Sequence, residues 1–461
     1  MNKLQHRIVG GLLAAAALLV AVASYIGLNG MGYHKLMDRQ ESGTVHFWYT
    51  NDLLTNYYNN VASIYNKTNR GANVVPQLVP ASEYLEKIYQ ASITGEGYPD
   101  MYVITSDAME KAYLAGLTMP VEDEEKVREA FPGVAMEAAS YDNTLFGYPF
   151  YFDTSTLVYN KTILEKVALD QFQIQAEAEG VENPEAIVVP DEDIARLVNV
   201  MIPETIDELI RLSNNLEAPE GMETVFKWNI NDIFFNYFYL GEYATLTDKE
   251  IDIYNEKTAA CMEIFKHVTE YFYMDAETVS TESILQEFME GKVLFTILDS
   301  ESALKLETAN KEGLIDFEYD YARTPDPGKI PQEDKAQMKG AISYEGRPLS
   351  VTNVVVINGY TNYPNTTNDF AQFLTMENVG IDQLYSKTGY IPASTNANTT
   401  SNMEEVFKAE YAESATIPSY MVTSNFWMLL ENAFNQIWDG ADAQTTLEEV
   451  ENRLKNQIPQ Q

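Results

Sequence analysis

The chain is poor in the residues that build disulfides and metal centres. Its 461 residues include one cysteine, Cys261, and four histidines. A single cysteine excludes an intramolecular disulfide, and its apolar, helix-like surroundings predict a buried free thiol. Four histidines argue against a His-rich metal site, and no Walker-type glycine loop is present. The sequence therefore predicts neither a metal nor a cofactor.

Positive charge is also scarce. The chain has 30 Lys and Arg against 69 Asp and Glu, a net charge of −39. Such a surface repels phosphate backbones, so nucleic acid is excluded as a partner. A neutral ligand would feel little of this field and a cation would be attracted, so small-molecule binding stays open.

The overall composition is that of a folded globular protein. Hydrophobic residues make up 45% and charged residues 21%, and 24 Gly with 18 Pro are too few for a low-complexity chain. The length is about three times that of an average domain of ~150 residues. Two or more domains are therefore expected.

One long apolar run stands near the N-terminus. Lys3 and Arg7 precede the uncharged residues 8–28, which are long enough to cross a hydrocarbon core of ~30 Å as a helix. We therefore predict a signal or anchor segment over residues 1–28, followed by a short glycine-containing stalk over residues 29–43.

The same run leaves two fates open for the leader. Ala21-Val22-Ala23 has the small residues of a cleavage site, so release near Ala23 is one alternative. The apolar run continues beyond this point, which favours an uncleaved anchor. Ser24 stands where a bacterial lipoprotein needs cysteine, so a thioether lipid anchor is excluded.

The body alternates strand and helix patterns, which predicts an α/β architecture with largely parallel strands. Residues 45–49 and 74–79 have strand patterns, and between them Tyr58, Val61, Ala62 and Tyr65 form one helical stripe. The sequence predicts further strands at 101–104, 292–298 and 350–358 and a helix at 107–115. Capping-box spacing predicts helix starts at Thr205, Ser283 and Thr445.

Residues 165–220 are unusually acidic, with 14 acidic residues against three basic ones. We interpret the stretch around Glu177 to Pro184 as a solvent-exposed insertion. A binding role for this insertion is the alternative interpretation.

Several motifs together resemble the extracellular solute-binding proteins of carbohydrate ABC transporters, the group that includes the maltodextrin-binding proteins. The most specific is LFGYPFYFDTSTLVYNK at 145–161, which is similar to the family's G-x-P, acidic residue and L-x-Y-N-K run. YPDMY at 98–102, AGL at 115–117, FMEGK at 288–292, TGYIP at 388–392 and a helix near Trp427 follow in the family's order. The span between Lys161 and Pro203 is longer than the family's usual link.

The resemblance implies a type II periplasmic-binding-protein fold, in which two α/β lobes hold a ligand in the cleft between them. We expect residues 44–150 and 300–352 in the first lobe, and residues 151–299 and 353–461 in the second. Crossing segments between the lobes are expected near 148–152, 298–300 and 350–353.

Sugar sites combine carboxylates that accept from hydroxyls with aromatic rings that cover the sugar face. The sequence and the resemblance together give eight candidate ligand-binding residues: Asp52, Asp107, Asp153, Trp228, Asp232, Asp299, Glu301 and Trp427. A hinge role is the alternative for Asp153, helix capping for Asp107, and core packing for the two tryptophans. Glu301 and Ile104 stand where maltodextrin binders have aromatic platforms, so a long α-glucan is not expected.

The predicted function is that of a non-enzymatic sugar-binding component of an ABC importer. It would act as a monomer on the outer face of the cytoplasmic membrane, with a carbohydrate and the permease subunits as partners. An anchored sugar sensor that reports to a separate receptor and a glycoside hydrolase are the alternatives.

Overall fold

The computed structural model describes residues 41–68, 71–247, 250–272, 274–276, 278–331, 340–418 and 426–456. The predicted anchor and nearly all of the predicted stalk lie outside these ranges. Within them, no helix combines the length and the apolar character needed to cross a membrane.

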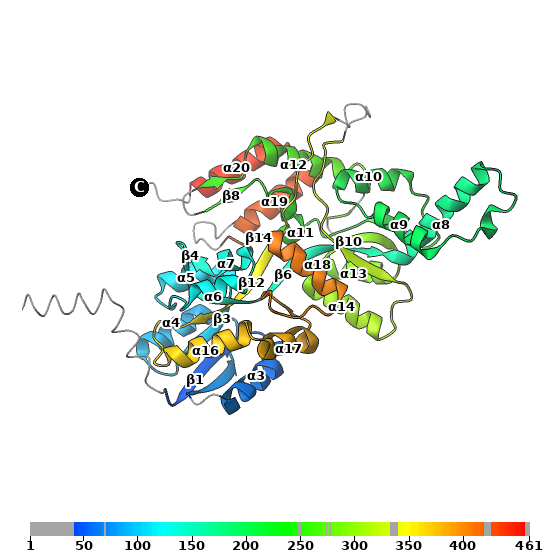
Figure 1. Ribbon diagram of the computed structural model, residues 1–461. Coiled ribbons are helices and arrows are strands. Elements are labelled where there is room, and N and C mark those ends of the chain that lie inside the picture. Colours follow the sequence, from blue (N-terminus) through cyan, green and yellow to red (C-terminus); the bar gives the residue numbers. More distant parts are fainter. Residues whose placement is uncertain are drawn as a thin grey trace, which may run out of the picture.

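The chain forms a ten-stranded mixed sheet with helices packed on it (Figure 1). The strands are β1 (Thr44–Tyr49), β2 (Asn73–Leu78), β3 (Met101–Thr105), β4 (Ser140–Tyr141), β5 (Thr144–Leu145), β6 (Gly147–Asn160), β7 (Thr224–Phe226), β8 (Thr245–Leu246), β9 (Ile251–Asp252), β10 (Val293–Asp299), β11 (Tyr319–Ala322), β12 (Leu349–Ile357), β13 (Ile391–Pro392) and β14 (Ala415–Thr416). The sheet order is β2-β1-β3-β12-β6-β10-β7, with β11 and β13 on β6 and β14 on β12.

The helices are α3 (Thr55–Thr68), α4 (Tyr84–Thr94), α5 (Met109–Leu114), α6 (Glu124–Glu129), α7 (Gly133–Ala138), α8 (Lys161–Ala178), α9 (Asp191–Met201), α10 (Ile206–Asn215), α11 (Ile233–Asn236), α12 (Glu256–Val268), α13 (Thr281–Met289), α14 (Ser300–Lys311), α16 (Pro364–Thr375), α17 (Asn378–Thr388), α18 (Asn402–Glu413), α19 (Phe426–Trp438) and α20 (Ala443–Lys455). Short 3-10 turns are η1 (Asp52–Leu54), η2 (Ser106–Ala108), η3 (Pro184–Ala186) and η4 (Tyr237–Tyr239).

The predicted first βαβ unit is confirmed. β1 and β2 are parallel and joined by α3, and β3 lies parallel on the other side of β1. The stripe from Tyr58 to Tyr65 on α3 is buried against Phe47 of β1 and Phe370 of α16. Burial of these rings fixes the face that α3 turns toward the sheet.

Two long strands, β6 and β12, connect the two halves of the sheet. The first half of β6 pairs antiparallel with β12, and its second half pairs antiparallel with β10 and β11. Gly147 starts β6, and a Cβ there would lie 2.3 Å from a methyl carbon of Val354. Glycine is therefore required where β6 and β12 approach. Because of these antiparallel pairs the sheet is mixed, whereas the sequence predicted largely parallel strands.

We define the first lobe as β1–β3, α3, α4, α16 and α17, and the second lobe as β7, β10, α8–α14, α19 and α20. α16 and α17 belong to the first lobe, because Tyr57 on α3 donates to the carbonyl of Gly380 and Tyr65 donates to Asp369. α14 packs against β10 and α13. The predicted lobe boundaries therefore differ from the structure, in which residues 354–388 pack on the first lobe and residues 300–311 on the second. The chain returns to the first lobe through β12.

Two of the three predicted helix starts are wrong by three residues. Thr205 caps α10 as expected, with its side chain accepting from the backbone of Glu208. The helices expected to start at Ser283 and Thr445 begin earlier, with Ser280 and Asp442 as N-caps. Another residue with a short polar side chain precedes each expected cap by three positions, and that earlier residue accepts from the N3 backbone.

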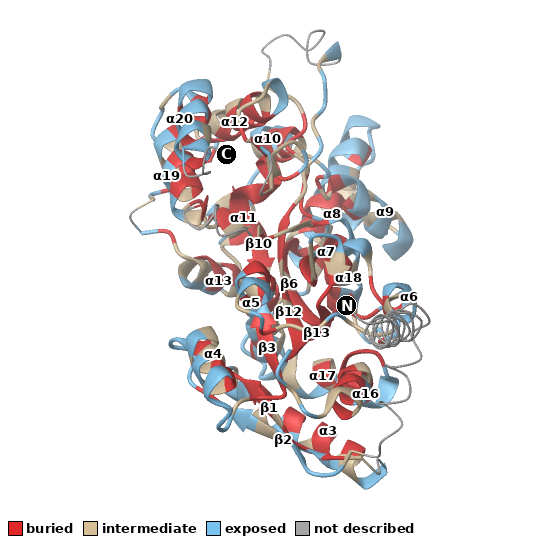
Figure 2. Cartoon of the chain, turned by 90° about the vertical axis from the view of Figure 1, so that its left-hand side faces the viewer, coloured by how far each residue is buried: buried red, intermediate tan, exposed pale blue. Residues whose placement is uncertain are grey.

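The acidic insertion forms two helices, α8 and α9, which pack on each other and project from the second lobe (Figure 1). Much of their surface is exposed (Figure 2). This agrees with the predicted solvent-exposed excursion. Cys261 of α12 is a buried free thiol, as predicted.

Candidate ligand-binding site

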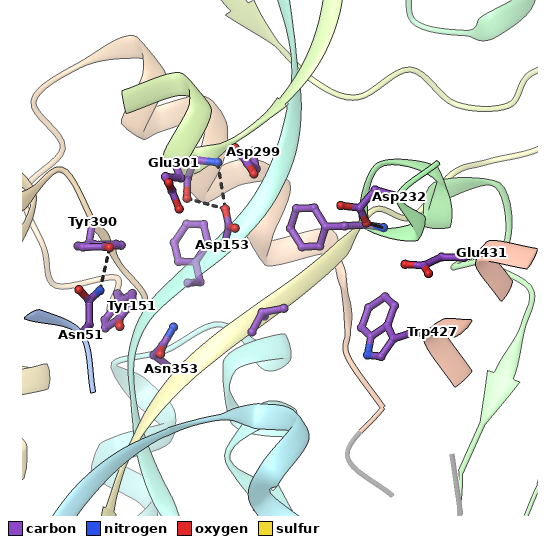
Figure 3. Close-up of a pocket in the computed structure, with 14 residues that line it drawn as sticks. Asn51, Tyr151, Asp153, Asp232, Asp299, Glu301, Asn353, Tyr390, Trp427 and Glu431 are labelled. Carbon is purple, nitrogen blue, oxygen red and sulfur yellow. Dashed lines mark hydrogen bonds between the residues drawn. The ribbon is translucent and has the colours of Figure 1, made fainter. Parts of the chain in front are cut away.

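A cavity of about 500 Å³ lies beside the crossing strands β6 and β12 (Figure 3). It is lined by residues of both lobes and of the crossing strands: Asn51, Tyr151, Phe152, Asp153, Asp232, Phe234, Asp299, Ser300, Glu301, Val351, Asn353, Tyr390, Trp427 and Glu431. Carboxylates and aromatic rings dominate this lining.

Asp153 lies on β6, at the point where this strand changes partners from β12 to β10. Its Oδ1 accepts from the backbone nitrogen of Ser300 at 2.9 Å and from the Ser300 hydroxyl at 2.5 Å. Burial, followed by the charge of Asp299, raises the pKa of Asp153 to about 7, although the two hydrogen bonds act in the opposite direction.

Asp299 and Glu301 stand where β10 ends and α14 begins. Asp299 is the N-cap of α14, and its Oδ1 accepts from the backbone of Ser302 at 2.7 Å. Burial and the neighbouring Glu301 raise the pKa of Asp299. Glu301 forms an ion pair with Lys305 one helical turn later, at 3.0 Å.

The second lobe supplies the wall formed by α11 and α19. Asp232 caps α11 by accepting from the backbone of Phe234 at 2.9 Å. Trp427 and Glu431 are four residues apart on α19 and therefore share one face of that helix. Burial raises the pKa of Asp232, and burial together with the charge of Asp232 raises that of Glu431.

The opposite wall is polar and aromatic. Asn51 follows β1, and its side-chain amide donates to the hydroxyl of Tyr390 at 2.8 Å. The rings of Tyr390 and Tyr151 lie 4.9 Å apart. Asn353 completes this wall on β12 (Figure 3). The wall therefore presents hydroxyl and amide groups to the carboxylates across the cavity.

A second cavity, of about 590 Å³, shares Asn51, Tyr151 and Asn353 with the first and extends along the first lobe. Its other lining residues come from the ends of β1 and β3 and from α4 and α5, and they include Tyr58, Glu83, Tyr84, Glu86 and Lys111. The two cavities form one elongated site, which we call the cleft.

Five of the eight predicted site residues line the cleft together: Asp153, Asp232, Asp299, Glu301 and Trp427. Asp52 and Asp107 do not line it. They are exposed in η1 and η2, and the residues beside them, Asn51, Thr105 and Ala108, line the cleft instead. Trp228 is 0% exposed in the core, where its indole nitrogen donates to Asn236 at 2.8 Å.

Several lining residues are not among the eight predicted ones, chiefly Asn51, Tyr151, Phe234, Asn353, Tyr390 and Glu431. Glu431 could have been found, because it lies one helical turn after Trp427 on the same face. Asn51 and Tyr390 come together only through the tertiary fold, since 339 residues separate them. No local pattern reveals such a pair.

Hydrogen-bonding groups and ring faces make the cleft suited to a polyhydroxylated ligand. Across the described ranges, no group of three or more His, Cys, Asp or Glu residues has an arrangement that could hold a metal ion. The lining and its position between the two lobes are those of a ligand-binding cleft, since pockets occur preferentially at such interfaces.

The sequence profile of the bacterial extracellular solute-binding proteins matches residues 60–413, which is more than half of the chain. The chain belongs to this family. Family membership agrees with the predicted resemblance and implies that the protein acts outside the cytoplasm. No curated protein sequence matches this solute-binding protein.

Three solved structures are similar to it in fold. An extracellular solute-binding protein from Staphylococcus aureus in complex with maltose is 16% identical, with a TM-score of 0.70 over 90% of this chain and 97% of that chain. A maltose-binding periplasmic protein from Listeria monocytogenes with maltose is 16% identical, with a TM-score of 0.68 over 90% and 98%. A cyclo/maltodextrin-binding protein with maltotetraose is 17% identical, with a TM-score of 0.68 over 92% and 99%. The α/β fold of type II periplasmic binding proteins is thereby confirmed.

Proposed function

We propose that this solute-binding protein captures a sugar or oligosaccharide in the cleft and delivers it to the permease of an ABC importer. The observation that carries the proposal is the lining of the cleft, in which carboxylates lie among aromatic rings from the crossing strand β6, from the second lobe and from Tyr390 on the opposite wall. Three solute-binding proteins of the same fold bind maltose or maltotetraose.

Capture requires a ligand that stabilises one arrangement of the lobes over another. A ligand shifts a conformational equilibrium only by its differential affinity for the two states. Asp153 and Asp299 on one side and Asn51 and Tyr390 on the other could both contact a ligand once the lobes approach. Closure would then depend on contacts made from both walls.

Thermal-shift measurements with a panel of sugars test the proposal. A ligand that binds only the folded state raises the apparent stability by RT ln(1 + [L]/Kd). We expect at least one mono- or oligosaccharide to raise the melting temperature of residues 44–461. If no sugar in a broad panel does so, the proposal is wrong.

Glycoside hydrolysis is tested with the same material, because Asp153 has the raised pKa of a general acid and Asp299 is a second carboxylate nearby. We propose binding without catalysis. Chromatography after long incubation should recover the sugar unchanged, and turnover to shorter products would instead assign the protein to the hydrolases.

We further propose that residues 8–28 tether the protein to the membrane, as their length and lack of charge predict. N-terminal sequencing of membrane-bound and released protein tests this. A mature chain that begins at Ser24 and is found in the medium would contradict retention. Two permease genes beside the gene would favour import over an anchored sensor.

A further inference from the structure

The cavity beside the crossing strands has a markedly acidic lining. Five carboxylates line it, from Asp153, Asp232, Asp299, Glu301 and Glu431, and the lining residues that the structure describes include no Lys, Arg or His. Glu301 has an ion pair with Lys305. Among the residues that the structure describes, none of the other four carboxylates forms an ion pair. A neutral sugar would leave these charges uncompensated.

Two of the carboxylates are each accompanied by a ring. Asp232 and Phe234 lie at the start of α11, and Glu431 and Trp427 lie on one face of α19 (Figure 3). A carboxylate beside the face of an aromatic ring suits a protonated amine, which can donate to the oxygens and lie over the ring. Burial is the main cause that raises the pKa values of Asp232 and Glu431, and the charge of Asp299 adds to it for Asp232 and that of Asp232 for Glu431. A ligand cation would offset these charges.

An independent observation in the adjoining cavity also points to a ligand. Tyr58 lines that cavity and is 0% exposed, and its hydroxyl has no hydrogen-bond partner among the described residues. Buried polar groups are rarely left unpaired, because desolvation without a partner is costly. A ligand hydroxyl extending along the first lobe would supply the missing partner. The adjoining cavity has one basic side chain, Lys111, so its charge is mixed.

We propose that the ligand of the cleft is an oligosaccharide that carries a protonated amine. The ammonium group binds between Asp232, Asp299 and Glu431, and the rest of the ligand extends past Asn51 toward Tyr58. This inference rests on the proposed function and narrows its substrate class.

Calorimetric titration with three matched tetrasaccharides tests the charge. The probes are the tetramer of glucosamine, the tetramer of N-acetylglucosamine, in which acetylation removes the charge, and maltotetraose, which never had one. At neutral pH the free amine should bind about tenfold or more tightly than either neutral probe, since hydrogen bonds to charged partners are the stronger ones. Added salt should reduce this difference.

Charge-removing variants locate the effect. Glu431→Gln and Asp232→Asn should each lower affinity for the glucosamine tetramer about tenfold, and should lower affinity for the neutral probes by a smaller factor, because only the amine loses a charge-assisted hydrogen bond. Asn at position 232 can still cap α11. Asp170→Asn on the exposed face of α8 is the matched control, because it removes one charge far from the cleft lining. Tyr58→Phe should lower affinity for the glucosamine tetramer and leave affinity for the glucosamine monomer unchanged, because only the tetramer extends toward Tyr58.

The outcomes separate this inference from the function on which it rests. If a neutral probe binds as tightly as the glucosamine tetramer or more tightly, the proposal that the ligand carries an amine is wrong, while the proposal of sugar capture stands. An equal loss in Asp170→Asn and Glu431→Gln would assign the effect to the net charge of the protein and would also overturn it. If no sugar of any kind binds, the proposed function itself fails.

Discussion

Asp153 on β6 accepts two hydrogen bonds from Ser300, one from its backbone nitrogen and one from its hydroxyl. Ser300 is the first residue of α14, so this pair joins a crossing strand to the helix that carries Glu301. The carboxylate of Asp153 therefore does two things at once. It lines the cleft, and it fixes the start of a helix in the second lobe.

Replacing Asp153 by alanine should lower both stability and ligand affinity. The variant leaves the Ser300 backbone nitrogen without its acceptor, which costs about 1–3 kcal/mol for a buried group. Asp153→Asn is the matched variant, because its amide oxygen can still accept from Ser300. Urea denaturation should therefore separate the two variants, and calorimetry should find reduced affinity in both. Unchanged affinity in both would place the ligand elsewhere.

The stability of the protein should depend on Asp153 in a defined pH window. Its pKa is raised from 3.8 to about 7 in the folded state. Below the lower value the folded and unfolded chains both hold the proton, so the contribution is fully present. Between the two values only the folded chain keeps the proton, so this contribution falls as pH rises, and above about 7 it changes no further.

Asp153→Asn isolates this effect. The variant should match the parent near pH 3.8 and become progressively more stable than the parent up to about pH 7. Glu410, whose pKa burial also raises to about 7, is present in both proteins and cancels in the difference. Denaturation at several pH values measures the difference. A constant offset across this range would contradict the assigned pKa.

Trp427→Ala should lower affinity for every sugar that binds, because it removes a ring from the cleft wall and leaves the carboxylates in place. A ring covers the face of a sugar whatever the orientation of its hydroxyl groups, so its loss should affect related sugars evenly. Loss of a carboxylate should instead alter discrimination between epimers. Met428→Ala is the control, since its side chain is 55% exposed on the same helix and does not line the cavity. Equal losses in the two variants would indicate a disturbed α19.

The strands could be predicted from the sequence because their signals are local. Runs such as residues 45–49 and 101–104 are largely apolar, bounded by polar residues, and mostly buried in the sheet as expected. Lobe membership could not be predicted in this way. Lobe membership depends on the strand with which β12 pairs from Asn353 onward. That strand is β3, and the pairing joins residues about 250 positions apart in the sequence.

In the candidate site, too, the residues with a local sequence signal could be predicted and those placed by long-range contacts could not. The carboxylates at strand ends, such as Asp299 at the end of β10, could be predicted because strand ends gather at one edge of a sheet. Trp228 was misjudged because a tryptophan among polar residues has the same local sequence whether it faces a ligand or the core. In the structure the Trp228 ring packs against Phe226, two positions earlier, and against Trp438, which is far away in the sequence. The contact with Trp438 is not visible in the local sequence.

Trp228 should therefore matter for stability and little for binding. It is buried, its ring stacks on Phe226, and its indole nitrogen donates to Asn236. Trp228→Phe removes this donor and leaves the Asn236 oxygen unpaired, which should cost about 1–3 kcal/mol, with a further cost for the lost volume. Affinity should change less than about threefold, because the ring does not line the cleft.

A double-mutant cycle separates the hydrogen bond from the lost volume. Trp228→Phe and Asn236→Leu are measured singly and together by urea denaturation. The double variant should lose less stability than the two single losses combined, since it removes both the indole donor and the amide oxygen of this hydrogen bond and leaves neither of them unpaired. Asn236 also donates to the backbone carbonyl of Asp232, so calorimetry on Asn236→Leu shows whether this contact positions Asp232. A large loss of affinity in Trp228→Phe, with Asn236→Leu unchanged, would mean that the indole itself contacts the ligand.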